Sequence, residues 1–198
     1  MLSPGVNSGF TSQPVLVIII GRVIYIKVAI FWLPTRRDYY MDIMNVLKRC
    51  EVFVGLDDND LEKIANLPSW HRDSYDVGDF VFRENAEVND FHILENGEVR
   101  LCVALPKEGS DEPMQIPVGN ITTGDILGWS ALVSPHFLTT SAVCVKPSSV
   151  IAVNRKELTG LMDCNQSLGY EVMKGLVRVI GARLRDLRLM FVSKFRLM

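Results

Sequence analysis

The most constraining feature of this sequence is a series of short, partly apolar segments between residues 74 and 153, separated by turn-forming residues. Gly78, Asn96–Gly97 and Gly109 lie in the expected turns. Turn signals about every 8–12 residues are typical of β-sandwiches and barrels. Eight or so such strands favour a double-sheet jelly roll. The expected strand segments are residues 74–82, 91–103, 114–118, 141–145 and 149–153.

The strongest local turn signal is the Asn96–Gly97 pair. Both residues adopt positive φ readily, which suits the two-residue turns of β-hairpins. The pair therefore predicts that the strand before it and the strand after it, within residues 91–103, pair with each other.

Helical patterns flank the strands on both sides. Residues 41–72 carry apolar side chains at helical spacing, and Asp58 or Asn59 is the expected N-cap of a helix there. Residues 157–162 predict a short helix, and a long helix follows from Gln166. The fold class is therefore mainly β with flanking helices. We expect a β-roll with its leading helices over residues 41–163 and a C-terminal helix over residues 164–198.

The first forty residues form a separate hydrophobic extension. Residues 15–33 are apolar apart from Arg22 and Lys27. The length suits a membrane span, but two central cations oppose insertion. Three interpretations remain open: a membrane anchor, a packed N-terminal extension, or a misassigned start, with Met41 as the true first residue. We expect a cytoplasmic protein, with membrane anchoring through residues 15–33 as the alternative.

The composition narrows the function classes. The chain has 198 residues and a formal net charge of −2, so no overall positive field attracts nucleic acid. Its cysteines and histidines share no metal-ligand spacing, so we expect no metal site. No nucleophile–base pair is apparent, and we expect no enzymatic activity. The residues concerned are Cys50, Cys102, Cys144, Cys164, His71, His92 and His136.

Three motifs occur in the order seen in one family of regulatory proteins. They are residues 76–86 (DVGDFVFRENA), 91–101 (FHILENGEVRL) and 123–128 (TGDILG). In this order they resemble the cyclic-nucleotide-binding domains of catabolite-activator and Fnr-type regulators, over roughly residues 41–189. Asn85 stands where that family usually has glycine, and asparagine also tolerates left-handed backbone. The resemblance implies a C-terminal helix that is both a lid over the pocket and a dimer contact, through Leu176, Val179, Ile180, Arg183 and Leu187.

The segment Gly124–Val143 corresponds to the phosphate-binding cassette of that family, and we expect its residues 126–132 to be helical. In family members, backbone N–H groups hold the cyclic phosphate, an arginine neutralises it and a glutamate accepts the ribose hydroxyl. Here Trp129 stands at the glutamate position and Thr139 at the arginine position. The ligand-binding positions that the resemblance implies are Gly128, Trp129, Ser130, Ala131, Thr139, Thr140 and Ser141.

Two interpretations of this cassette stay open. In one, a modified pocket binds cyclic AMP or another small phosphorylated ligand, and the chain is a regulatory ligand sensor that signals through its C-terminal helix as a homodimer. In the other, the pocket is vestigial and the roll is an interaction scaffold. A truncated transcriptional regulator is a third alternative. Direct DNA binding is not expected, because no helix-turn-helix pattern follows the C-terminal helix before Met198.

Overall fold

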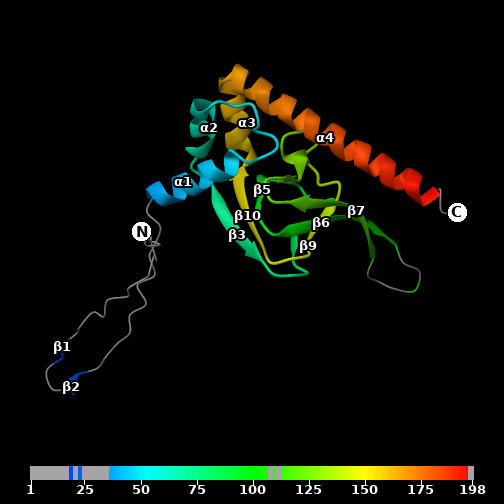
Figure 1. The fold of residues 1–198 in the computed structure, drawn as a ribbon, viewed down its shortest axis with the longest axis horizontal. Helices are drawn as coiled ribbons and strands as arrows, with labels where there is room; N and C mark the ends of the chain where they lie inside the picture. Colours follow the sequence, from blue (N-terminus) through cyan, green and yellow to red (C-terminus); the bar gives the residue numbers. More distant parts are fainter. Residues whose placement is uncertain (1–17, 20–21, 24–35, 107–108, 110–112, 196–198) are drawn as a thin grey trace, which may run out of the picture.

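The computed structural model describes residues 18–19, 22–23, 36–106, 109 and 113–195 (Figure 1). Strands β1 (Ile18–Ile19) and β2 (Arg22–Val23) pair antiparallel. The rest of the apolar run at residues 15–33 lies outside the described residues, so its three interpretations stay open. Within the described ranges, no helix is both long and apolar enough to cross a membrane.

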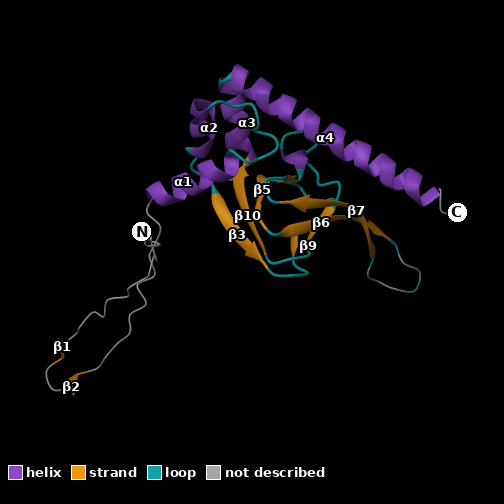
Figure 2. Cartoon of the chain, viewed as in Figure 1, coloured by secondary structure: helices purple, strands orange, loops and turns teal. Residues whose placement is uncertain are grey.

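Two four-stranded antiparallel sheets form the body of the described chain, which confirms the predicted jelly roll. The first sheet has the order β3-β10-β5-β8 and the second β4-β9-β6-β7. Figure 2 shows these strands below a group of helices. The strands are β3 (His71–Tyr75), β4 (Phe80–Phe82), β5 (Asp90–Asn96), β6 (Glu98–Leu105), β7 (Met114–Thr122), β8 (Ile126–Leu127), β9 (Ser141–Cys144) and β10 (Ser148–Asn154).

The hairpin predicted at Asn96–Gly97 is wrong. Among the described pairings, β5 joins β10 and β8, whereas β6 joins β7 and β9 in the other sheet. The chain therefore turns a corner between the two sheets at this point. Gly97 has φ 105°, and a Cβ there would lie 2.7 Å from the carbonyl oxygen of Pro147. Glycine is thus required by the close approach of the 147–148 backbone rather than by a hairpin turn.

The core lies on both faces of the first sheet. Val150, Ile151, Ala152 and Val153 of β10 are all buried, because β10 is a central strand with helices on one face and the second sheet on the other. Toward the helices, Ile151 and Val153 join Phe91 and Ile93. Toward the second sheet, Val150 packs with Leu94, Val99, Ile121, Leu127, Ala142 and Cys144.

The first helix begins earlier than the sequence indicates, and the second has a different N-cap. α1 (Arg36–Leu47) begins before Met41, so it crosses the expected boundary at residue 40. The Tyr39 hydroxyl donates a hydrogen bond of 2.9 Å to the carbonyl of Trp70, which ties this turn to the body. α2 (Asp58–Ala65) is capped by Asp57 rather than by Asp58 or Asn59, since the Asp57 carboxylate accepts from the N–H of Asp60.

The two C-terminal helices are α3 (Arg155–Cys164) and α4 (Gln166–Phe195), separated at Asn165. The first half of α4 is anchored in the core by Leu168, Val172, Leu176 and Val179. Figure 1 shows its second half continuing across the roll toward β7. α4 therefore has a packed inner half and an outer half with many exposed apolar side chains.

Candidate functional site

The cassette segment opens with a strand rather than with the helix predicted for residues 126–132. Ile126 and Leu127 form β8 and pair with Ile93 and His92 of β5. Both side chains are fully buried, so the sheet pairing and the core outweigh the helical pattern. The helical part of the segment is the single 3₁₀ turn η1 (Trp129–Ala131), which follows Gly128.

Gly128 is the hinge between β8 and this turn. Its φ and ψ are 68° and 58°, a left-handed conformation that glycine adopts without strain. A Cβ on Gly128 would lie 3.0 Å from Leu138 and 3.5 Å from the Phe82 ring. A side chain here would therefore press into the wall that supports the cassette.

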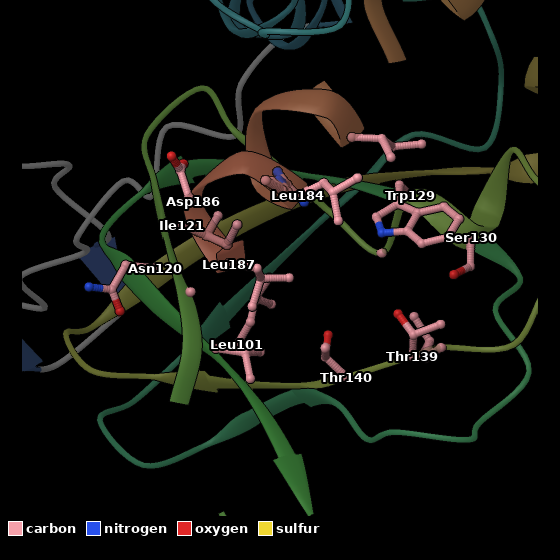
Figure 3. A pocket seen from close by; sticks show the side chains of 16 residues that line it. Leu101, Asn120, Ile121, Trp129, Ser130, Thr139, Thr140, Leu184, Asp186 and Leu187 are labelled. Carbon is pink, nitrogen blue, oxygen red and sulfur yellow. The ribbon is translucent and has the colours of Figure 1, made fainter. Parts of the chain in front are cut away.

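A cavity of about 340 Å³ lies between the cassette and the outer half of α4 (Figure 3). Five predicted ligand-binding residues line it: Gly128, Trp129, Ser130, Thr139 and Thr140. The cavity size is in the range typical of small-molecule sites. The remaining described lining residues are Leu101, Val118, Gly119, Asn120, Ile121 and Leu138 from the roll, and Ile180, Arg183, Leu184, Asp186 and Leu187 from α4.

Two predicted positions are not among the described lining residues. Ala131 is fully buried in the core beneath the helices. Ser141 is buried in β9, and its hydroxyl accepts a hydrogen bond of 3.0 Å from the N–H of Glu84. Both side chains are thus used to hold the cassette in place and do not face the cavity.

The predicted residues of the C-terminal helix also divide into two groups. Ile180, Arg183 and Leu187 line the cavity. Leu176 and Val179 are buried against the body of the same chain, and the dimer contact implied for them stays a prediction.

The position that the resemblance assigns to a glutamate carries an indole. Trp129 is partly buried against the core and also lines the cavity (Figure 3). Thr139 and Thr140 contribute hydroxyl groups where a cationic side chain is implied. The cassette side of the cavity is therefore uncharged over its described residues.

Arg183 provides a contact that sequence reasoning missed. Its Nη2 donates to Glu51 Oε1 and to the carbonyl of Ile126, each at 2.7 Å, and the Ile126 N–H donates to the same Glu51 oxygen at 3.0 Å. β8 is the last strand of its sheet. The side chains of Arg183 and Glu51 therefore supply hydrogen bonds to backbone groups of Ile126 at this edge. Burial raises the pKa of Glu51, and the Ile126 hydrogen bond and the Arg183 charge only partly offset that effect.

No local pattern connects Arg183 with Glu51, since 132 residues separate them. The one available signal was an arginine within the apolar face of a helix that packs on the roll. A cation at such a position needs a partner when it is partly buried.

Among the described residues, no group of three histidine, cysteine, aspartate or glutamate side chains is arranged to hold a metal ion. Cys50, Cys102 and Cys144 are buried free thiols, and Cys164 is exposed. Burial raises the pKa of the Cys50 thiol to about 12, which keeps it protonated and unreactive.

Residues 72–165 match the family model described as the cyclic nucleotide-binding domain. The comparison with curated protein sequences returns no match. A structure of a protein described as cyclic nucleotide-binding, from Geobacter metallireducens GS-15, is 28% identical with a TM-score of 0.58, covering 71% of this chain and 96% of its own.

Two further solved structures share the fold at lower identity. The N-terminal domain of a transcriptional regulator from Streptomyces coelicolor is 20% identical with a TM-score of 0.52, covering 74% of this chain and 94% of its own. The regulatory subunit of a cAMP-independent protein kinase A from Trypanosoma brucei, as a mutant bound to cAMP, is 19% identical with a TM-score of 0.60. Its alignment covers 79% of this chain and 52% of that one. Over residues 72–165, the roll of this chain is therefore similar to cyclic nucleotide-binding domains.

Proposed function

We propose that this chain is a regulatory ligand-sensing domain that binds a small molecule between its cassette and α4. The observation that carries the proposal is the cavity itself, which is lined by residues 128–130 and 139–140 on one side and by α4 on the other. A ligand there contacts both elements, so its binding energy differs between a closed and an open position of α4. That difference is what shifts a conformational equilibrium.

The outer half of α4 is the element that reports the ligand. Leu184 is 66% exposed and Leu187 is 38% exposed, although both line the cavity. A bound molecule covers these side chains and stabilises the closed position. The Arg183–Glu51 pair holds the helix at the same point without ligand. The exposed apolar residues beyond it, including Leu189 and Val192, are the proposed homodimer contact.

Cyclic AMP is the first ligand to test, because a relative of the same fold has been solved with it. The cassette of this chain offers cyclic AMP neither an arginine for its phosphate nor a glutamate for its ribose. Losing a charge-assisted contact costs about 1.5–3 kcal/mol, so cyclic AMP binding here is weak. We place the protein in a reducing compartment such as the cytoplasm, since its four cysteines are free.

The second candidate function is an interaction scaffold that binds no small molecule. The loss of both charged cassette contacts favours it. Calorimetric titration with cyclic AMP, cyclic GMP and cyclic dinucleotides, together with hydrogen exchange of α4, separates the two. Heat of binding and slower exchange over residues 180–192 support the sensor. Absence of both at millimolar concentration supports the scaffold.

A further inference from the structure

The charges around the cavity suit a particular class of ligand. We infer that the cavity selects uncharged, largely apolar small molecules over anionic ones, and that Thr139 and Trp129 set this preference. The inference rests on the proposed ligand-sensing function and names its ligand class. It disfavours cyclic nucleotides as ligands, because their phosphate is anionic.

The charged lining residues are the first reason to expect a preference for uncharged ligands. Of the described lining residues, Arg183 is the one cation and Asp186 the one anion. Arg183 is already bonded to Glu51 and to the Ile126 carbonyl. An anion that recruits Arg183 leaves the partly buried Glu51 carboxylate without its partner, and breaking such a pair is strongly unfavourable. An anion that leaves Arg183 in place gains no paired cation from the cassette.

The apolar lining of the cavity is the second reason to expect an uncharged, largely apolar ligand. Leu101, Ile121 and Leu138 lie on the roll side, and Ile180, Leu184 and Leu187 lie on the α4 side. The indole of Trp129 adds an aromatic surface to the lining (Figure 3). An apolar ligand removes the exposed leucines of α4 from water, which is favourable in proportion to the area covered.

The uncharged polar groups of the lining can form hydrogen bonds with a neutral ligand. Thr139, Thr140 and Ser130 present hydroxyls, and Asn120 presents an amide. Hydroxyl and amide groups both donate and accept hydrogen bonds, so they match carbonyl, hydroxyl or amine groups of an uncharged molecule. They do not neutralise a formal charge.

A matched pair of fluorescent probes tests the preference on the full chain. N-phenyl-1-naphthylamine is uncharged, and 8-anilino-1-naphthalenesulfonate has the same ring system with an added sulfonate. We expect the uncharged probe to bind at least about tenfold more tightly to the wild-type protein, which corresponds to about 1.4 kcal/mol. Thr139→Arg should reverse or abolish that ratio, because it adds an unpaired cation to the cassette wall.

Two further variants locate the probes. Leu184→Asp changes an exposed α4 position that lines the cavity and should weaken the uncharged probe at least about tenfold. Thr123→Arg adds the same charge as Thr139→Arg at an exposed position outside the described lining, and it should leave the ratio unchanged. Circular dichroism of each variant establishes that it is folded.

Each outcome decides a different claim. Equal or tighter binding of the sulfonate probe to the wild-type protein overturns the charge preference and leaves the ligand-sensing proposal standing. Binding that neither Thr139→Arg nor Leu184→Asp alters places the probes elsewhere and also overturns the preference. Failure of both probes to bind, together with no heat from cyclic nucleotides, overturns the preference and the ligand-sensing proposal together.

Discussion

Arg183 on α4 and Glu51, after α1, are joined by a hydrogen-bonded ion pair of 2.7 Å across 132 residues of sequence. The same Arg183 Nη2 reaches the Ile126 carbonyl, two residues before Gly128. α4 is therefore tied directly to the strand that positions the cassette. Movement of α4 away from the cavity at Arg183 must therefore break this contact.

The Arg183–Glu51 contact should control how easily the outer half of α4 opens. Arg183→Met removes hydrogen bonds to a carboxylate and to a carbonyl, and we expect the free energy of unfolding to fall by about 1–3 kcal/mol. Hydrogen exchange over residues 180–192 should become faster. Arg185→Met, at an exposed position on the same helix, is the control and should change stability by less than about 0.5 kcal/mol. Equal effects of the two variants would show that the ion pair does not hold α4.

Close packing of α4 on the segment between α1 and α2 depends on Gly175. A Cβ at this position would overlap the carbonyl oxygen of Val52, so Gly175→Ala must displace the helix. We expect a loss of about 2–4 kcal/mol by chemical denaturation. Gly181→Ala is the matched control, because a Cβ placed there would have no described atom within 4 Å apart from its chain neighbours and the adjacent backbone of α4. There the better helix propensity of alanine should stabilise the protein by about 0.5–1 kcal/mol. Similar results for both variants would contradict this packing.

Stability at acidic pH should depend on Glu95. Burial raises the pKa of its carboxyl, but the hydrogen bonds from Arg72 and Ser149 outweigh burial and hold the pKa below the ordinary value. Arg72 donates Nε and Nη2 to the two carboxylate oxygens, each at 2.7 Å. Because the folded-state pKa is lowered, the stabilisation is present above the unfolded value near 4.5 and is lost as pH falls through the folded-state pKa.

We therefore expect Glu95→Gln to lower the free energy of unfolding at pH 7 by about 1–2 kcal/mol. At pH 3 the difference should be smaller, since the wild-type carboxyl is then more often protonated. Denaturant titrations at the two pH values measure the change. Glu62→Gln, at an exposed position of α2, is the control. A constant difference at both pH values would mean that ionisation of Glu95 does not contribute.

The overall fold could be predicted because its signals are local. Alternating apolar segments and turn residues are sufficient to indicate two sheets, and the long helix shows in the spacing of Leu168, Val172 and Leu176. Asn85 has φ 65°, as its place in a glycine position implied. These features depend on neighbours within a few residues, which a sequence pattern records.

The wrong predictions concern positions whose structure is set by contacts with segments distant in the sequence. Asn96–Gly97 carries a hairpin signal, but the approach of Pro147 and Ser148 turns the chain into the other sheet. Ile126 and Leu127 suit a helix until pairing with β5 places them in a strand. The Arg183–Glu51 pair joins two separate elements and has no local signature. Five of the seven positions predicted for a ligand line the cavity, and which side chains face inward depends on this long-range packing; their role in binding stays a prediction.

We propose that the cassette and α4 enclose a ligand site in which Trp129 and Thr139 occupy the places of charged contacts. Calorimetric titration of the Trp129→Glu, Thr139→Arg double variant with cyclic AMP, beside the wild-type protein, tests it most directly. Each restored charge-assisted contact is worth about 1.5–3 kcal/mol, so affinity should rise on the order of a hundredfold or more. Unchanged weak binding by a folded double variant would contradict the placement of these residues in a ligand site.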